Sequence, residues 1–301
     1  MTPLLVVIAG PTAVGKTQLC VQVAQHFNTE IISADSRQFY KELAIGTAKP
    51  TFQEMQNVKH HFVNFLSIQQ NYNVNEFEKE ALVVLNKLFK QHQIVILTGG
   101  SGLFIDALCD GFDDDLPGAD EQLRAELETL YQKYGIEILQ KKLNQLDPKF
   151  YQKIDLNNIK RLTRAIEVCM ITGKPYSELR KGTKQNRPFN LLKIALNRNR
   201  EELFERINLR VEKMIQEGLL NEVKSVLVDK DKNALKTVGY SELFDFLEDK
   251  CTFEQAITNI KINTRRYAKK QINWFSKDTD YQWFHPDEIN EIINLITITI
   301  N

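Results

Sequence analysis

Residues 4–17 read LLVVIAGPTAVGKT, and this stretch decides the fold class of the chain. Leu4–Ala9 is a continuous apolar run, which is typical of a strand buried on both faces of a parallel sheet. Gly10–Thr17 then fits the phosphate-loop pattern GxxxxGK[ST], and Thr17–Phe27 has a helical pattern. A strand, a glycine-containing turn and a helix in this order predict a loop that binds a diphosphate or a triphosphate.

The residue types in this loop suit a phosphate ligand. Glycines let the main chain curl so that successive N–H groups face an anion, and the helix start adds a positive dipole end. Lys16 is predicted to neutralise the distal phosphate, and the Thr17 hydroxyl to hold Mg²⁺, the one expected cofactor. The predicted diphosphate-binding residues are Gly10, Pro11, Thr12, Ala13, Val14, Gly15, Lys16 and Thr17.

Strand and helix patterns continue to alternate after the loop. Strands are predicted at Glu30–Ala34, Ile94–Thr98 and Leu191–Leu196, and an amphipathic helix at Phe77–Phe89. This alternation indicates an α/β protein with a P-loop NTPase-like parallel sheet.

The segment between the third and fourth predicted strands has no strand pattern. Helices are predicted there at Asp120–Tyr134, Glu137–Leu143 and Asn157–Ile171. We therefore expect a catalytic core formed by residues 1–112 and 188–301 and a helical insertion at 113–187. After the fourth strand, helices are expected at about 200–217, 219–228, 240–248 and 253–275.

The composition sets limits on the class of protein. Lys plus Arg and Asp plus Glu are both 39, so the net charge is zero and any nucleic-acid site depends on local patches. The four cysteines form no CxxC pair, and the five histidines are dispersed, which argues against a zinc site. No stretch approaches the ~20 apolar residues of a membrane helix. We expect a cytoplasmic protein without a membrane partner.

Asp35 follows the second predicted strand. Ligands of open parallel sheets lie at the carboxyl ends of strands, so Asp35 and the phosphate loop are expected to face one crevice. A general base, a Mg²⁺ partner and a plain turn or N-cap aspartate are all compatible with this position. The third strand is followed by Gly99-Gly100 and not by an Asp, which argues against a motor or switch NTPase.

Basic residues gather in three places. Lys174 to Arg200 holds eight basic residues and one acid, and Lys261 to Lys277 holds six and none. The second run also contains Tyr267, Trp274 and Phe275. A third group is Lys160, Arg161 and Arg164. Any single run is typical of a solvated helix face, but three runs and a phosphate loop make a nucleic acid a serious candidate partner.

Taken together, these motifs resemble the tRNA dimethylallyltransferases, also called tRNA isopentenyltransferases, of the bacterial type without a zinc finger. The resemblance runs in order along nearly the whole chain. Its segments are Gly10–Thr17, Ser33–Tyr40, Ile45–Pro50, Gly99–Phe104, Lys160–Val168, Thr172–Pro175, Arg206 to Glu222, Val238–Glu242 and Thr264–Phe275. There are departures: Ser101 stands where Thr is usual and keeps the hydroxyl, whereas Lys270 stands where Arg is common and keeps the charge but loses the bidentate fork.

The resemblance implies a reaction and roles for three residues. The family transfers the dimethylallyl group of dimethylallyl diphosphate to N6 of the adenosine 3′ to the anticodon of tRNA. By resemblance, Asp35 accepts the proton of the amine, and Ser101 hydrogen-bonds near the bridging oxygen. Arg210 and Lys16, with Mg²⁺, would stabilise the charge on the departing diphosphate.

The resemblance also implies RNA contacts. The helical insertion would grip the anticodon stem-loop, and the protein is expected to act as a monomer. The residues matched to RNA-contacting segments are Asp35, Ser36, Arg37, Gln38, Lys160, Arg161, Leu162, Thr163, Arg164, Lys236, Gly239, Tyr240, Lys270, Gln271 and Trp274. Three alternatives stay open at this stage: a small-molecule kinase, a prenyltransferase acting on free adenine nucleotides, and a non-catalytic RNA-binding protein.

Overall fold

The chain folds into two compact units. The computed structural model describes residues 2–111, 116–180 and 184–300. One unit, the core unit, comprises Met1–Cys109 and Asn186–Asn301, and the other, the helical unit, comprises Asp110–Gln185. Each unit has its own hydrophobic core.

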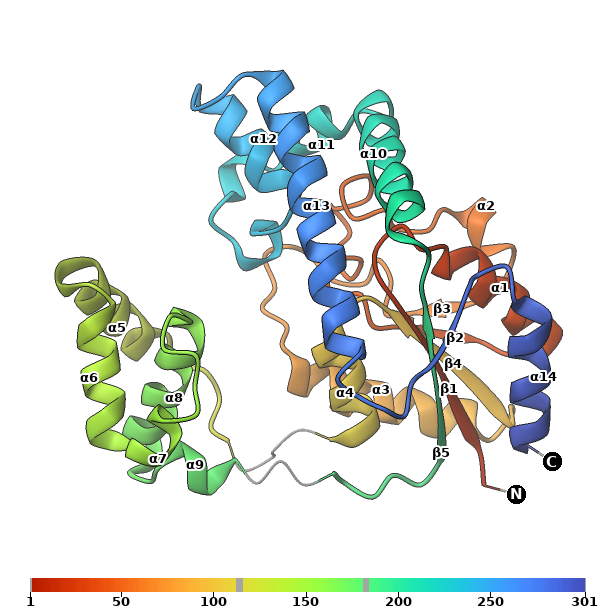
Figure 1. Ribbon diagram of the computed structural model, residues 1–301, viewed down its shortest axis with the longest axis horizontal. Helices are drawn as coiled ribbons and strands as arrows, with labels where there is room; N and C mark the ends of the chain where they lie inside the picture. Colours follow the sequence, from red (N-terminus) through yellow and green to blue (C-terminus); the bar gives the residue numbers. More distant parts are fainter. Residues whose placement is uncertain (1, 112–115, 181–183, 301) are drawn as a thin grey trace. The chain divides into compact units, whose positions relative to one another are not determined.

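The core unit is built on a six-stranded parallel sheet (Figure 1). Its strands are β1 (Leu4–Ala9), β2 (Ile31–Ser33), β3 (His60–His61), β4 (Ile94–Gly99), β5 (Asn190–Leu196) and β6 (Gln282–Phe284). Their order across the sheet is β3-β2-β4-β1-β5-β6, so β1 lies between β4 and β5. This topology is the P-loop NTPase-like α/β fold. The four predicted strands are confirmed, whereas β3 and β6 were not predicted.

Alternate residues of β1 pack into two different hydrophobic clusters, one on each face of the sheet. Leu5 and Val7 join the cluster that packs under α3 (Val74–Leu88) and α4 (Gly102–Asp110). Val6 and Ile8 join the cluster that packs under α1 (Lys16–His26) and α14 (Ile289–Ile300). Because apolar residues face both ways, β1 is covered on both sides, as a continuous apolar run requires.

Long helices continue the core unit beyond β5. They are α10 (Arg200–Gln216), α11 (Leu219–Ser225), α12 (Tyr240–Leu247) and α13 (Phe253–Phe275). One further short helix of this unit, α2 (Phe52–Met55), precedes β3. Thr252 begins α13 with a capping box, in which Thr252 and Gln255 satisfy each other's main-chain N–H groups. The predicted helix at 219–228 ends earlier, at Ser225, and 3₁₀ turns follow at Leu227–Asp229 and Asn233–Leu235.

The helical unit is a small bundle. Its helices are α5 (Glu121–Tyr134), α6 (Ile136–Leu146), α7 (Pro148–Tyr151), α8 (Ile159–Thr172) and α9 (Tyr176–Leu179). Its fully buried residues come from α5, α6 and α8, among them Leu127, Leu139 and Leu162. The absence of a strand pattern between residues 120 and 171 therefore predicted the structure of this segment correctly.

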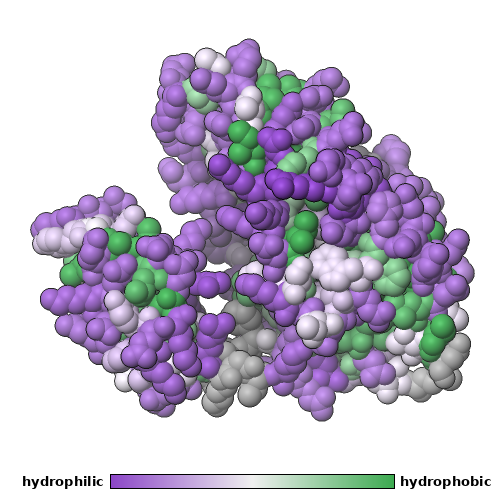
Figure 2. Space-filling view, viewed as in Figure 1, coloured by the Kyte–Doolittle hydropathy of each residue, from purple (hydrophilic) through white to green (hydrophobic). Residues whose placement is uncertain are grey.

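Most of the visible surface is hydrophilic, and its apolar residues appear as small separate areas (Figure 2). Within residues 2–111, 116–180 and 184–300, no helix combines the length and the apolar character that a membrane span needs.

Candidate active site

The phosphate loop connects β1 to α1 with a strained main chain. Gly10 and Gly15 have φ angles of 151° and 114°, and Ala13 lies in the left-handed region at 66°. A Cβ atom at Gly10 would lie 2.8 Å from the carbonyl oxygen of Leu196 on β5. The first glycine of the motif is therefore required both by its conformation and by the close approach of β5.

Lys16 folds back over the loop. Its Nζ donates to the carbonyl oxygens of Gly10 at 2.9 Å and Pro11 at 2.8 Å. Burial lowers the pKa of Lys16 to about 8, with Asp35 raising it and Arg210 lowering it. A buried ammonium with only carbonyl partners is ready to exchange them for a bound anion.

Asp35 lies two residues beyond the end of β2. Its Oδ1 accepts a hydrogen bond from the main-chain N–H of Arg37 at 3.2 Å. Burial raises the pKa of the Asp35 carboxyl, and the charge of Lys16 opposes this shift. Asp35 and Lys16 therefore lie close enough for each to influence the charge of the other, and the raised pKa makes Asp35 a stronger base than an ordinary carboxylate.

Ser101 follows β4, the strand that lies between β2 and β1. Its Oγ accepts from the main-chain N–H of Ser36 at 3.2 Å and lies 3.3 Å from the Ser36 hydroxyl. Tyr267 of α13 belongs to the same group, although the sequence pointed to it only as an aromatic residue in a basic run. Burial and the charge of Asp35 raise the pKa of its phenol to about 12, and the Ser101 hydroxyl lowers it.

Two side chains reach Thr12 of the loop from different helices. Arg210 on α10 donates from Nη1 to the Thr12 hydroxyl at 3.3 Å, and burial followed by the charge of Arg206 lowers its pKa. Gln271 on α13 accepts the Thr12 main-chain N–H at 2.8 Å. The Thr12 amide, which was predicted to face the diphosphate, thus has a protein partner in this structure.

The segment after Asp35 points its long side chains into the protein. Arg37 donates from Nη1 to the carbonyl oxygen of Asn233 at 2.9 Å. Gln38 donates from Nε2 to the carbonyl oxygens of Thr47 at 3.2 Å and Ala48 at 3.1 Å. These two predicted RNA contacts thus have structural partners that fix the loops around Asp35.

The segment around α12 is divided between surface and interior. Lys236 is exposed, whereas Gly239 and Tyr240 are buried. The Tyr240 hydroxyl donates to Glu222 Oε1 at 2.5 Å, and the same carboxylate accepts the main-chain N–H groups of residues 44–46 at 2.8 to 2.9 Å. Tyr240 therefore cannot contact RNA directly with its side chain in this conformation. Glu222, which sequence reasoning did not assign to the site, holds the 44–46 turn.

The three predicted residues of α13 have different surroundings. Lys270 is exposed. Trp274 is 37% exposed, and its Nε1 donates to Asp106 Oδ2 at 2.9 Å. Gln271 is only 5% exposed, so its predicted contact with RNA is replaced by contacts inside the core unit.

The predicted stretch of the helical unit lies at the start of α8. It contributes Lys160, Arg161, Leu162, Thr163 and Arg164. Lys160 and Arg161 are exposed, whereas Leu162 is fully buried and supports the bundle core. Arg164 donates from Nη1 at 2.6 Å to Glu167, whose side chain is fully buried. Two of the five residues thus present free cationic surface to a partner, and Arg164 is engaged within the unit.

The fold and the site together define a P-loop α/β protein with an acid, a hydroxyl and cations at the ends of neighbouring parallel strands. In the described parts of the chain, no group of three His, Cys, Asp or Glu side chains could hold a metal ion.

Comparison with known proteins gives the family. Residues 38–278 match the family model of IPP transferase. The chain is 49% identical to tRNA dimethylallyltransferase 2 of Azobacteroides pseudotrichonymphae, over 95% of this chain and 93% of that protein. It is 46% identical to tRNA dimethylallyltransferase 1 of Bacteroides thetaiotaomicron, over 98% and 96%. This chain belongs to the IPP transferase family.

Solved structures agree with this assignment. Full-length tRNA isopentenylpyrophosphate transferase from Bacillus halodurans aligns with a TM-score of 0.74 and 36% identity, over 100% of this chain and 97% of that one. A eukaryotic dimethylallyltransferase acting on tRNA aligns with a TM-score of 0.75 and 29% identity, over 90% and 69%. The resemblance read from the motifs is confirmed at the level of the family.

Proposed function

We propose that this chain transfers the dimethylallyl group from dimethylallyl diphosphate to N6 of adenosine 37 in tRNA and releases diphosphate. The observation that carries the proposal is the meeting of Asp35 with the phosphate-loop lysine, Lys16, at the carboxyl edge of the sheet. Asp35 can accept the proton that the amine must lose. Lys16 can neutralise the negative charge that the leaving group gains. The names of the relatives supply the transferred group, dimethylallyl, and the RNA acceptor, tRNA.

In this reaction the N6 nitrogen forms a bond to C1 of the dimethylallyl group while the C1–O bond breaks. The bonding electron pair leaves with the diphosphate, and the N6 proton passes to the Asp35 carboxylate. We assign to Ser101, which lies beside Ser36 and Tyr267, a hydrogen bond to the oxygen that departs. A base at Asp35 contributes roughly 10²–10⁴ to the rate.

The diphosphate is held by cations and main-chain amides of the loop. Lys16 and Arg210 supply positive charge, and the N–H groups of Ala13 and of residues 15–17 supply donors. The Thr17 hydroxyl would hold Mg²⁺, because Mg²⁺ prefers oxygen donors. When bound, Mg²⁺ would neutralise charge on the leaving group.

The RNA contacts of the proposal rest on exposed cations. Lys160 and Arg161 of the helical unit and Lys236 and Lys270 of the core unit are exposed, and cations track the phosphate backbone. The partner segment would be the anticodon stem-loop, bound by a cytoplasmic monomer. Replacing any one of these exposed lysines that contacts a phosphate by Met should reduce the salt dependence of tRNA binding.

The first experiment follows label from radiolabelled dimethylallyl diphosphate into unmodified tRNA with Mg²⁺, for the wild type and Asp35→Asn. Label in tRNA from the wild type and at least about 10²-fold less from the variant is expected. Equal label from both proteins would remove Asp35 from the role of base. Label in AMP or ADP instead of tRNA would favour a nucleotide-prenylating enzyme, and ATP turnover without any transfer would favour a kinase.

A further inference from the structure

The phosphate loop is held from its outer side by two guanidinium groups. Arg198, just after β5, donates from Nε to the carbonyl oxygen of Val14 at 2.9 Å. Arg206 on α10 donates from Nε to the carbonyl oxygen of Ala13 at 2.9 Å. Ala13 has a φ of 66°, a left-handed conformation that is unfavourable for a residue with a side chain. The loop therefore needs outside contacts to keep this shape.

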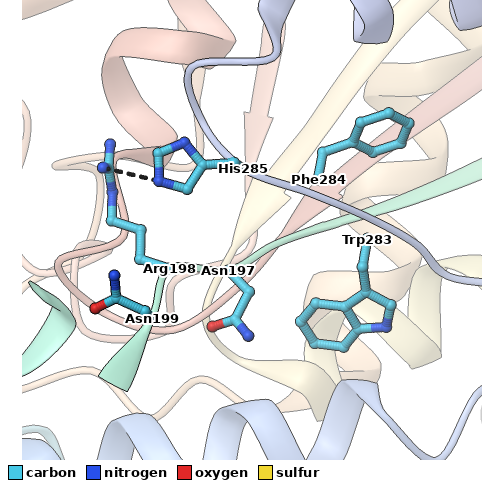
Figure 3. Close-up of a pocket in the computed structure, with 6 residues that line it drawn as sticks. All are labelled: Asn197, Arg198, Asn199, Trp283, Phe284 and His285. Atoms are coloured by element: carbon cyan, nitrogen blue, oxygen red, sulfur yellow. Dashed lines mark hydrogen bonds between the residues drawn. The ribbon is translucent and has the colours of Figure 1, made fainter. Parts of the chain in front are cut away.

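Arg198 is itself fixed in orientation (Figure 3). It lines an open surface pocket of about 320 Å³ together with Asn197, Asn199, Trp283, Phe284 and His285. Its Nη1 donates to His285 Nε2 at 3.2 Å and to the carboxylate of Glu202, and its side chain is 10% exposed. Since acidic neighbours balance its charge, the effect of Arg198 on the loop is mainly one of position.

Gln271 holds the loop through a main-chain N–H group, whereas the two arginines hold it through main-chain carbonyl oxygens. Its Oε1 accepts from Thr12 N at 2.8 Å, and its Nε2 donates to the carbonyl oxygen of Gly100 at 2.9 Å. A Cβ atom at Gly100 would lie 2.2 Å from Nε2, so the amide packs closely against the turn after β4. A carboxamide is suited to this place because one end accepts while the other donates.

We propose that Gln271, Arg198 and Arg206 are positioning residues that set the shape of the phosphate loop for diphosphate. Their three hydrogen bonds act on the main chain of three consecutive residues, Thr12 to Val14. The outward carbonyl of Val14 leaves the N–H of Gly15 directed at the anion, as in other anion-binding nests, whereas the N–H of Val14 donates to the carbonyl oxygen of Pro11 at 3.4 Å. The Thr12 amide is not one of the ligand's donors. This inference rests on the diphosphate site of the proposed function.

The test titrates inorganic diphosphate with Mg²⁺ at pH 7 into the full-length protein by calorimetry. Gln271→Ala should weaken binding at least about fivefold, the loss expected for one hydrogen bond to a buried group. Arg206→Lys keeps the charge but loses the fixed Nε geometry, and should also weaken binding. Gln255→Ala, which removes a cap from the same helix α13 without touching the loop, is the matched control and should bind like the wild type.

Hydrogen exchange read at individual amides separates positioning from a general loss of stability. The Thr12 amide should exchange slowly in the wild type with and without diphosphate, rapidly in Gln271→Ala, and slowly in Gln255→Ala. Wild-type affinity in Gln271→Ala, or a Thr12 resonance that shifts on diphosphate addition as much as those of residues 13–17, would overturn the inference alone. A wild type that binds no diphosphate would overturn the proposed site as well.

Discussion

The low pKa of Lys16 predicts how strongly the use of dimethylallyl diphosphate depends on pH. Burial holds this pKa at about 8, below the usual 10.5, even though Asp35 opposes the shift. Only the protonated amine neutralises a diphosphate. With a pKa of about 8, the protonated fraction falls from roughly nine-tenths at pH 7 to roughly one-tenth at pH 9. We expect kcat/KM for dimethylallyl diphosphate to fall about tenfold over this range.

The assay measures initial rates of transfer to tRNA at saturating tRNA and at a series of pH values from 6 to 9.5. Lys16→Met should be slow and should lack the fall between pH 7 and 9. Lys213→Met is the matched control, because this lysine is 71% exposed on α10, and its profile should be that of the wild type. A wild-type kcat/KM that is equal at pH 7 and 9, or a Lys16→Met enzyme with the same fall, would refute the reasoning.

Three further predictions concern charge and packing. Burial raises the pKa of the Asp35 carboxyl, so the folded state binds this proton more tightly than the unfolded chain, and its ionised form lowers stability at neutral pH. Asp35→Asn should therefore raise Tm at pH 7, and a lower Tm would contradict this. Gly99→Ala should lower Tm, because its Cβ would lie 2.4 Å from a main-chain carbonyl oxygen, whereas Gly118→Ala has nothing within 4 Å and should melt like the wild type. Glu167→Gln removes the carboxylate charge that pairs with Arg124 and Arg164, and should lower the free energy of unfolding by about 2 kcal/mol. Hydrogen exchange should then accelerate in α5 and α8, and unchanged exchange there would rule out this account.

The sequence predicted the elements that have strong local patterns. Leu4–Ala9 and Ile94–Thr98 are continuous apolar runs, and the structure confirms them as strands. The two-residue β3 and the three-residue β6 are too short to carry a pattern, and both depend on a neighbouring strand for their hydrogen bonds. The helix α14 includes the alternating stretch ITITI, whose β-branched residues locally favour a strand, so packing against α1 determines its form.

The candidate site was predictable where a motif fixes a local geometry, and less so where distant segments meet. Lys16 and Asp35 lie at strand ends, and the sheet brings them together as expected. The role of Gln271 could not be read from α13 alone, because its partners are 259 and 171 residues away in the chain. Spacing along a helix does not indicate which face is buried beneath another segment. Buried Tyr240 was therefore assigned, like exposed Lys236, to the RNA surface.

The place of β1 in the sheet has a consequence for the order of events during synthesis. One edge of β1 pairs with β4, and the other pairs with β5, which begins only at Asn190. The helical unit between them is therefore translated while one hydrogen-bonding edge of β1 still lacks its neighbour. Open apolar edges recruit other strands, so a nascent or truncated chain that stops before residue 190 exposes a surface prone to aggregation.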